Sequence, residues 1–380
     1  MSRTSTSTHI PATGKPRMID DLISVILECN DHWWPRDYQR LALVSSAWLG
    51  PIRRRLYACP SLRTFHACNL FVRTVANNPC ILSLVQGVDL RPMMSFRDRY
   101  ALTEKDMTSL RFILNLAGLQ SLTLGGELAV QAERFLHMMT NARSITSLHI
   151  DGSYIQCNDT LDCRHPASLE WNETIAFRFT KLRSLRLTNL QLAISDPPLP
   201  YSLRIADITL NDVTVSVGSV HHLCHESWGS VRTLSVTSKN AQESDELVRD
   251  LMECCENLEV LHYEVCSAGA HGEIFEEDTP LSRLRNLCLY DIDISPQTLI
   301  VLSQTCKALE HLSVLGRTVR LAATDWAGFV RSGALPSLRV LRTSMGTNSP
   351  LSGFTPWTTA MMTPVSDSCV ARGITLSVCE

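Results

Sequence analysis

The sequence lacks an excess of charge of either sign. Lys and Arg number 35 against 38 Asp and Glu, which gives a formal net charge of −3 at pH 7. The basic residues are scattered along the chain rather than gathered in one stretch. Binding to nucleic acid relies on concentrated positive charge that neutralises phosphates. We therefore expect no nucleic acid among the partners.

Long hydrophobic runs are also absent. The longer ones, such as residues 81–85, fall far short of the roughly 20 residues that cross a bilayer, and the first residues lack the apolar run of a secretion signal. We expect no membrane partner and a cytoplasmic or nuclear location, where the 14 cysteines are reduced thiols. Because Arg3, Lys15 and Arg17 precede the first acidic residue, an organellar transit peptide is the alternative.

Motifs that carry catalysis are missing as well. The sequence has no G-x-S-x-G elbow, no phosphate-binding glycine loop and no cysteine-protease signature, and the pair Gly125-Gly126 is interpreted as a turn after a strand. Two clusters combine thiols with imidazoles, but neither has the paired C-x-x-C spacing of a structural zinc site: His221, His222, Cys224 and His225, and Cys157, Cys163 and His165. We predict no catalytic residue, no metal and no cofactor, with a thiol hydrolase or zinc protein as the remaining alternative.

The N-terminal part of the chain predicts a short tail and a small helical domain. Residues 1–17 have no apolar periodicity and are expected to be disordered. From Ile19 onward, apolar residues recur at helical spacing through Ile26, and Pro35 and Pro51 are expected to open a second and a third helix. Residues 18–60 therefore predict a three-helix domain, whose roughly 40 residues are near the lower limit for a self-sufficient core.

The rest of the chain is built from an internal repeat, L-x-x-L-x-L. Nine copies lie mostly 23 to 29 residues apart, beginning at Leu119, Ile145, Leu182, Ile205, Val231, Leu258, Leu284, Leu309 and Leu338, and an earlier copy begins at Val85. This period is typical of leucine-rich repeats. The long interval that contains residues 151–180 is expected to hold an insertion, as are residues 91–105.

Each repeat predicts one strand and one helix, so the fold class is α/β. Stacked repeats form a solenoid with a parallel sheet on its concave face, here over residues 61–345, followed by an irregular C-terminal cap over residues 346–380. Within the strands, Leu122, Leu148, Leu185, Leu234, Leu261, Leu287 and Leu312 should be buried in one line. Helical spacing between strands is seen at Leu299, Leu302, Cys306 and Leu309, and Cys254 and Cys255 are expected to pack like small apolar residues.

The variable positions beside the leucines form the available surface of such a sheet. Strand side chains alternate between the two faces, so these positions project from the concave face. Mixed charge with Tyr and Arg suits a protein partner better than a phosphate-rich ligand. We predict a binding surface for a protein substrate at Arg186, Asp207, His262, Glu264, Tyr290, His311 and Arg342, with His149 and Asp151 on the same face.

Two parts of the sequence resemble the F-box leucine-rich-repeat family. The helical domain is similar to the F-box of fungal F-box-like proteins in the segments Asp21-Leu22-Ile23 with Ile26, Leu41-Ala-Leu-Val44-Ser45, Trp48-Leu-Gly-Pro51 and Arg55-Leu56-Tyr57. Residues 294–309 resemble the cysteine-containing repeats of that family.

The resemblance implies a subunit that recognises substrates for ubiquitin-dependent degradation. In that family the F-box docks on the Skp-family adaptor of a cullin-RING ubiquitin ligase, and the repeats hold the substrate. By resemblance, the adaptor-binding positions are Leu22, Ile26, Leu41, Val44 and Trp48. The alternative is a protein-binding scaffold in which the helical domain only caps the first repeat.

Overall fold

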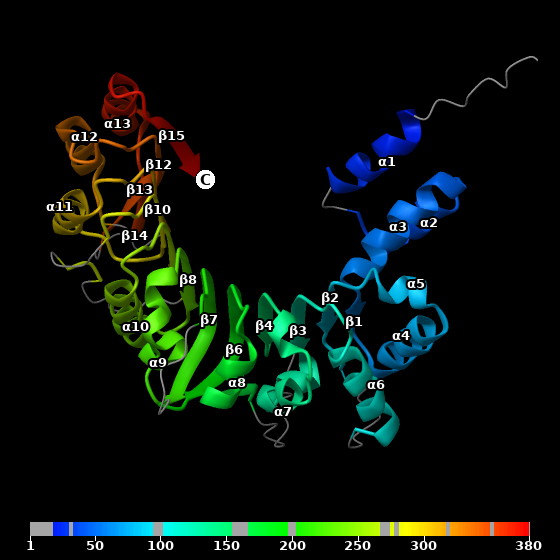
Figure 1. Cartoon of the computed structure of the whole chain (residues 1–380). Coiled ribbons are helices and arrows are strands. Elements are labelled where there is room, and N and C mark those ends of the chain that lie inside the picture. The colour runs from blue at the N-terminus through cyan, green and yellow to red at the C-terminus, as the bar shows by residue number, and fades with distance from the viewer. Residues whose placement is uncertain are drawn as a thin grey trace, which may run out of the picture.

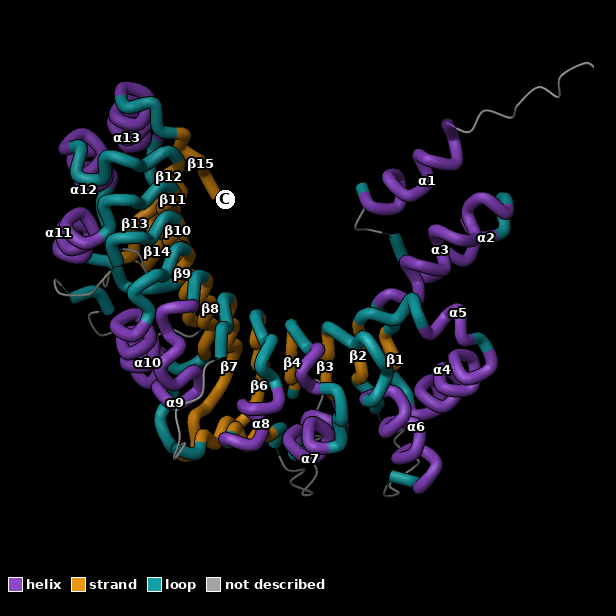
Figure 2. Tube along the Cα trace, viewed as in Figure 1, coloured by secondary structure: helices purple, strands orange, loops and turns teal. Residues whose placement is uncertain are grey.

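Strands line the inner side of an arc and helices cover its outer side in the computed structural model of the chain (Figures 1 and 2). The structure describes residues 18–29, 33–93, 102–153, 166–196, 203–266, 274–276, 281–316, 320–349 and 353–379. The predicted tail, residues 1–17, lies outside this range. None of the described helices is both long and apolar enough to cross a membrane.

Three helices, here called the head, lie at the N-terminal end of the arc (Figure 1). They are α1 (Met18–Glu28), α2 (Pro35–Ala42) and α3 (Ser46–Ala58). The prediction that Pro51 opens the third helix is wrong, because Pro51 lies inside α3. Ser45 is the N-cap of α3, in an extended conformation, and its carbonyl accepts a hydrogen bond from Trp48. Val44 thus lies in the turn between α2 and α3.

The rest of the described chain forms the solenoid. Its parallel sheet follows the chain order β1 to β4, β6 to β12 and then β15, with β5 paired to β6 as a side branch. The strands are β1 (Ser61–Leu62), β2 (Gly87–Leu90), β3 (Ser121–Gly125), β4 (Ser147–Asp151), β5 (Ser168–Trp171), β6 (Ser184–Ile194), β7 (Asp207–Val217), β8 (Thr233–Ser238), β9 (Val260–Val265), β10 (Asn286–Tyr290), β11 (His311–Leu315), β12 (Val340–Ser344) and β15 (Thr375–Cys379).

Helices connect these strands on the convex side. They are α4 (Phe65–Asn77), α5 (Pro79–Leu82), α6 (Glu104–Leu114), α7 (Ala132–His137), α8 (Glu173–Arg178), α9 (His221–Cys224), α10 (Ala241–Cys254), α11 (Pro296–Thr305), α12 (Ala323–Ser332) and α13 (Thr359–Ala371), with short 3-10 turns at Gly126–Ala129, Ala142–Ser144 and His225–Ser230. Several begin at a side-chain cap that accepts a hydrogen bond from the third helical residue: Thr64, Thr103, Asn172 and Ser295.

The repeat register confirms the leucine-rich-repeat solenoid. The central leucines pair across neighbouring strands, for example Leu261 with Leu287 and Leu287 with Leu312. Every leucine predicted to lie in the buried line is at most 1% exposed, and the helical positions Leu299, Leu302, Cys306 and Leu309 are buried beside them. Cys255 is buried too, whereas Cys254 is half-buried. One continuous apolar core runs from Leu62 to Ile374.

Each concave strand segment ends in a turn that often needs a left-handed backbone. Positive φ occurs at this place in Gly126 (57°), Asn189 (49°), Asp212 (50°), Asp291 (55°) and Gly316 (104°). At Gly316 a Cβ atom would lie 2.3 Å from the Oδ1 atom of Asp291, so only glycine fits. In β6 and β7 the strand continues beyond the turn, which makes these two strands 11 residues long.

Two expected irregular regions are ordered. The interval 151–180 is only partly an insertion, because residues 166–179 contain β5 and α8, whose Trp171 and Ile175 are fully buried. Residues 154–165 and most of the expected insertion at 91–105 lie outside the described residues. The irregular cap is wrong for 353–379: α13 and β15 form one further repeat, and β15 pairs with β12. A small antiparallel hairpin, β13 (Gly346–Ser349) with β14 (Gly353–Pro356), precedes them.

Candidate functional site

The concave sheet brings the predicted substrate-binding residues onto one face. All seven are exposed or half-buried. Arg186, His262 and Arg342 occupy the position between the two buried residues of their strands. Asp207 and His311 occupy the position before the first buried residue, and Glu264 and Tyr290 the position after the second. The residues are spread along the arc from β6 to β12, and a partner that touched them all would be held along several repeats.

One part of this set forms a compact group. Glu264 and Tyr290 are register partners on β9 and β10. The Nε2 atom of His262 lies 3.5 Å from the Oε2 atom of Glu264. These residues offer an acceptor, an imidazole and a phenol ring side by side, which are groups that bind polar protein surfaces.

A second polar group, which the sequence analysis found only in part, lies near the N-terminal end of the sheet. Arg91 bridges two carboxylates, with Nε 2.7 Å from Asp89 and Nη1 2.6 Å from Asp151. Burial raises the pKa of Asp151, but hydrogen bonds from Ser153 and the charge of Arg91 outweigh it, so its pKa is lowered. Asp89 occupies the same strand position as Arg186, a signal that could have identified it.

His149 adjoins this group and is neutral at pH 7. Burial lowers its pKa to about 4, and the charges of Arg186 and Arg91 act in the same direction. Its Nε2 atom lies 3.2 Å from the hydroxyl of Thr188 on the next strand. The N-terminal half of the concave face therefore carries a fixed ionic network with an uncharged imidazole beside it.

A thiol, an imidazole and a carboxylate meet on the convex side. The Sγ atom of Cys254 lies 3.0 Å from Nδ1 of His221, whose Nε2 is 3.7 Å from Asp250. Burial raises the pKa of Cys254, and the charges of Asp250 and Glu253 raise it further. A nucleophilic thiol needs a lowered pKa, so this environment disfavours the reactive thiolate.

In the described part of the chain, no three His, Cys, Asp or Glu side chains are grouped closely enough to hold a metal ion. Cys157, Cys163 and His165 lie outside the described residues.

The head carries an exposed apolar surface. Of the predicted adaptor-binding residues, Leu22 is 47%, Ile26 44% and Val44 67% exposed, whereas Leu41 and Trp48 are half-buried against the head's own core. That core consists of Ile23, Leu27, Tyr38 and Ile52 and is separate from the solenoid core. Three further exposed residues were missed: Val25, Trp34 and Leu43.

Helix α1 explains how the head can have both a core and an apolar surface. Ile23 and Leu27 face inward, while Leu22, Val25 and Ile26 form a second stripe that faces outward. A solvated surface helix needs only one apolar stripe. The number of apolar residues in this short helix was therefore a signal, available in the sequence, that a second face is present.

Comparison with known proteins adds one distant similarity. No family model and no curated protein matches the chain. Among solved structures it is similar to an internalin (InlF) from Listeria monocytogenes, at 11% sequence identity and a TM-score of 0.30, over 82% of this chain and 89% of that one. The two chains superpose poorly at that score, so the repeat architecture rests on the register and burial described above.

Proposed function

We propose that this chain is the substrate receptor of a cullin-RING ubiquitin ligase, with the head docking on a Skp-family adaptor and the concave face holding a protein substrate. The chain itself has no catalytic role in this proposal and works in the cytoplasm or nucleus. It raises the concentration of a substrate near the subunits that transfer ubiquitin.

The outward apolar stripe of α1 is the observation that carries the proposal. A head that only capped the first repeat would lay its apolar residues on the solenoid core. Instead Leu22, Val25 and Ile26 are exposed, and the head packs around a core of its own. Among the apolar residues of the head that the structure describes, only Tyr57, near the end of α3, packs against the solenoid core. A grouped apolar surface of this kind marks an interaction site, and the resemblance to the F-box names the partner.

Replacing Ile26 with aspartate tests the docking. Ile26 is exposed, so an aspartate there stays hydrated in the free protein and the head should fold. In a docked complex the carboxylate would be buried without a partner. We expect Ile26→Asp to abolish co-purification of the adaptor and cullin from eukaryotic cells that express the tagged chain.

A matched control distinguishes docking from a general effect of charge. Ile300 is 48% exposed on α11, far from the head in the sequence, and Ile300→Asp should leave co-purification unchanged. If the folded wild-type chain recovers neither adaptor nor cullin, the scaffold alternative is correct. The first cause to examine would then be Met18-Ile19, which stands where the family usually has Leu-Pro.

A further inference from the structure

The second half of β7 has one unpaired edge. β8 accompanies β7 only as far as the pair Asn211–Thr237. The two strands then part, and Lys239 spans the gap with its Nζ atom 2.5 Å from Asp212. Along residues 213–217, β6 lies on one side of β7, and no strand lies on the other among the described residues. β5, β6 and β7 thus form a small lateral sheet with an open side.

Some main-chain amides and carbonyls of β7 point out of this edge, away from β6. The amide of Gln191 donates to Ala167, so the amide and carbonyl of Gln191 face β5. Successive residues alternate in direction, and Leu192 therefore faces β7. Because Leu192 is paired with Val215 in a parallel ladder, Thr214 and Ser216 face β6. The amides and carbonyls of Val213 and Val215 consequently face away from β6.

This edge lacks two of the usual protections against strand addition, charge and proline, although its pairing with β6 shifts register between Leu192 and Ala193. Natural edge strands carry charges, prolines or bulges that prevent pairing with another chain. Residues 213–217 read Val-Thr-Val-Ser-Val, with high strand propensity and neither charge nor proline. Val217 is 63% exposed. This sequence thus favours pairing with a further strand, and no strand pairs with this edge among the described residues.

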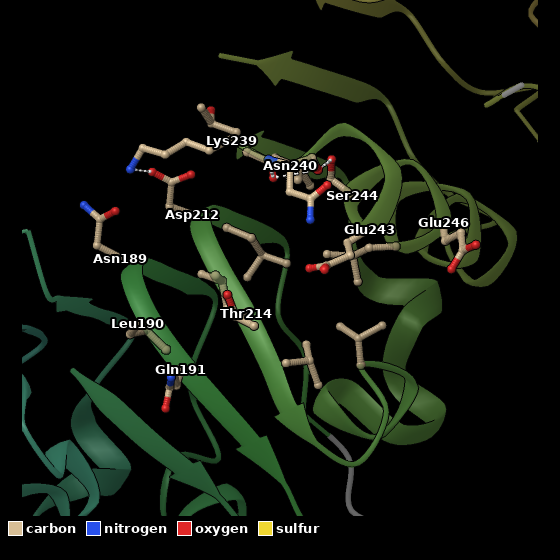
Figure 3. A pocket seen from close by; sticks show the side chains of 18 of the residues that line it. Asn189, Leu190, Gln191, Asp212, Thr214, Lys239, Asn240, Glu243, Ser244 and Glu246 are labelled. Carbon is tan, nitrogen blue, oxygen red and sulfur yellow. Dashed lines mark hydrogen bonds and ion pairs between the residues drawn. The ribbon is translucent and has the colours of Figure 1, made fainter. Parts of the chain in front are cut away.

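The open edge lines a cleft of about 700 Å³, here called the lateral cleft. β7 forms one wall and α10 the opposite wall, and Figure 3 shows Glu243 extending from α10 toward the strand that carries Thr214. Apolar side chains contribute to the lining: Leu190, Leu210, Val213, Val215, Val220, Val236 and Leu247. The cleft combines main-chain donors and acceptors with an apolar lining.

Negative charge dominates the cleft. Glu243, Glu246 and Asp250 line it from α10, and Asp212 lines it from β7. Lys239 is the basic residue among the lining side chains, and it is paired with Asp212. An occupant that carried Lys or Arg would be attracted to the α10 wall, and one that carried carboxylates would be repelled.

We infer that the lateral cleft binds an extended basic segment of a partner protein, which adds as a strand along residues 213–217. The amides and carbonyls of Val213 and Val215 bind the main chain of the segment, while Glu243, Glu246 and Asp250 select its Lys or Arg side chains. The cleft is lined by residues other than the predicted concave and head residues, and this inference does not depend on adaptor docking.

A labelled peptide tests the inference on the full chain. The probe is fluorescein-labelled Lys-Val-Lys-Val-Lys-Val-Lys, followed by fluorescence anisotropy. We expect saturable binding that weakens at least about tenfold between 0.05 and 0.5 M salt, because the screening length shortens. A peptide of the same sequence in which every main-chain amide is methylated should bind at least about tenfold more weakly, since it cannot donate hydrogen bonds to the strand.

Variants of the two walls separate the contributions. The double change Glu243→Lys and Glu246→Lys should weaken probe binding at least about tenfold. Glu253→Lys, on the same helix but outside the cleft lining, should change it less than about twofold. Val215→Pro removes an amide that faces the cleft without removing a bond to β6, so it should abolish binding while the circular dichroism spectrum stays unchanged.

Four results would overturn the inference. They are no binding of the probe, equal binding of the methylated peptide, equal binding of a Glu-Val peptide of the same length, and equal binding by the double variant. The alternative occupant of the edge is a second copy of this chain, and light scattering tests it by measuring the oligomeric state. A dimer of the wild-type chain that Val215→Pro dissociates would show that a second copy fills the edge.

Discussion

Replacing Leu287 with alanine measures how much one repeat contributes to the solenoid core. Leu287 is 1% exposed and lies between Leu261 and Leu312 on the neighbouring strands. Removing three carbon atoms forfeits about 2.4 kcal/mol of transfer free energy. If half of the ~75 Å³ void persists, the cavity adds about 1 kcal/mol. We therefore expect the free energy of unfolding to fall by about 3.5 kcal/mol, within the range of about 2 to 5 kcal/mol for such changes.

Guanidinium unfolding followed by far-ultraviolet circular dichroism gives this quantity, and native-state hydrogen exchange locates it. Repeat stability is mostly a sum of neighbouring interfaces, so lost protection should concentrate in β9, β10 and β11. Ser313→Ala, on the concave face of β11, is the control and should change stability by less than about 0.5 kcal/mol. Equal effects of the two substitutions, or an evenly spread loss of protection, would refute the assigned face of β10.

Two further predictions concern protons and metals. The pKa of His149 is about 4 in the folded chain against a usual 6.5. Between pH 4 and pH 6.5 the unfolded chain therefore binds a proton that the folded chain does not bind. The contribution of His149 to stability should be full above pH 6.5 and should fall as the pH is lowered toward 4. Urea midpoints at pH 7 and pH 5 should differ less in His149→Gln than in the wild type, and an unchanged difference would contradict the assignment. Excess EDTA should leave the thermal melting curve unchanged, and a lowered melting temperature would reveal a metal site.

The solenoid was predictable because burial dictates the repeat. In L-x-x-L-x-L, each leucine must reach the core that neighbouring repeats share, so the spacing survives wherever a strand stacks on another. The concave surface followed from the same alternation, since a strand residue between two buried residues must face the other way. Arg186, His262 and Arg342 share one row for that reason.

Regions that depend on distant contacts were not predictable in the same way. In β5 only Leu169 and Trp171 stand at the positions that leucines occupy in the repeat, which is too few for a repeat to be recognised. This strand is ordered by pairing with the second half of β6. β15 follows Gly373 and lacks a complete L-x-x-L-x-L copy. The lateral cleft arises because β7 extends beyond the end of β8. This difference in length depends on where α10 begins.

The junction between head and solenoid has a geometric consequence. Only Cys59 and Pro60 separate α3 from β1, and the carbonyls of Ala58 and Pro60 accept hydrogen bonds from Gln86 and Asp89. A short, hydrogen-bonded connection thus joins the head to the solenoid, in place of a flexible linker. Anything that docks on the head is presented at a set angle to whatever lies on the concave face. In a ligase, such a connection would restrict which lysines of the substrate come within reach of ubiquitin, so the choice of lysine would follow from orientation as well as from affinity.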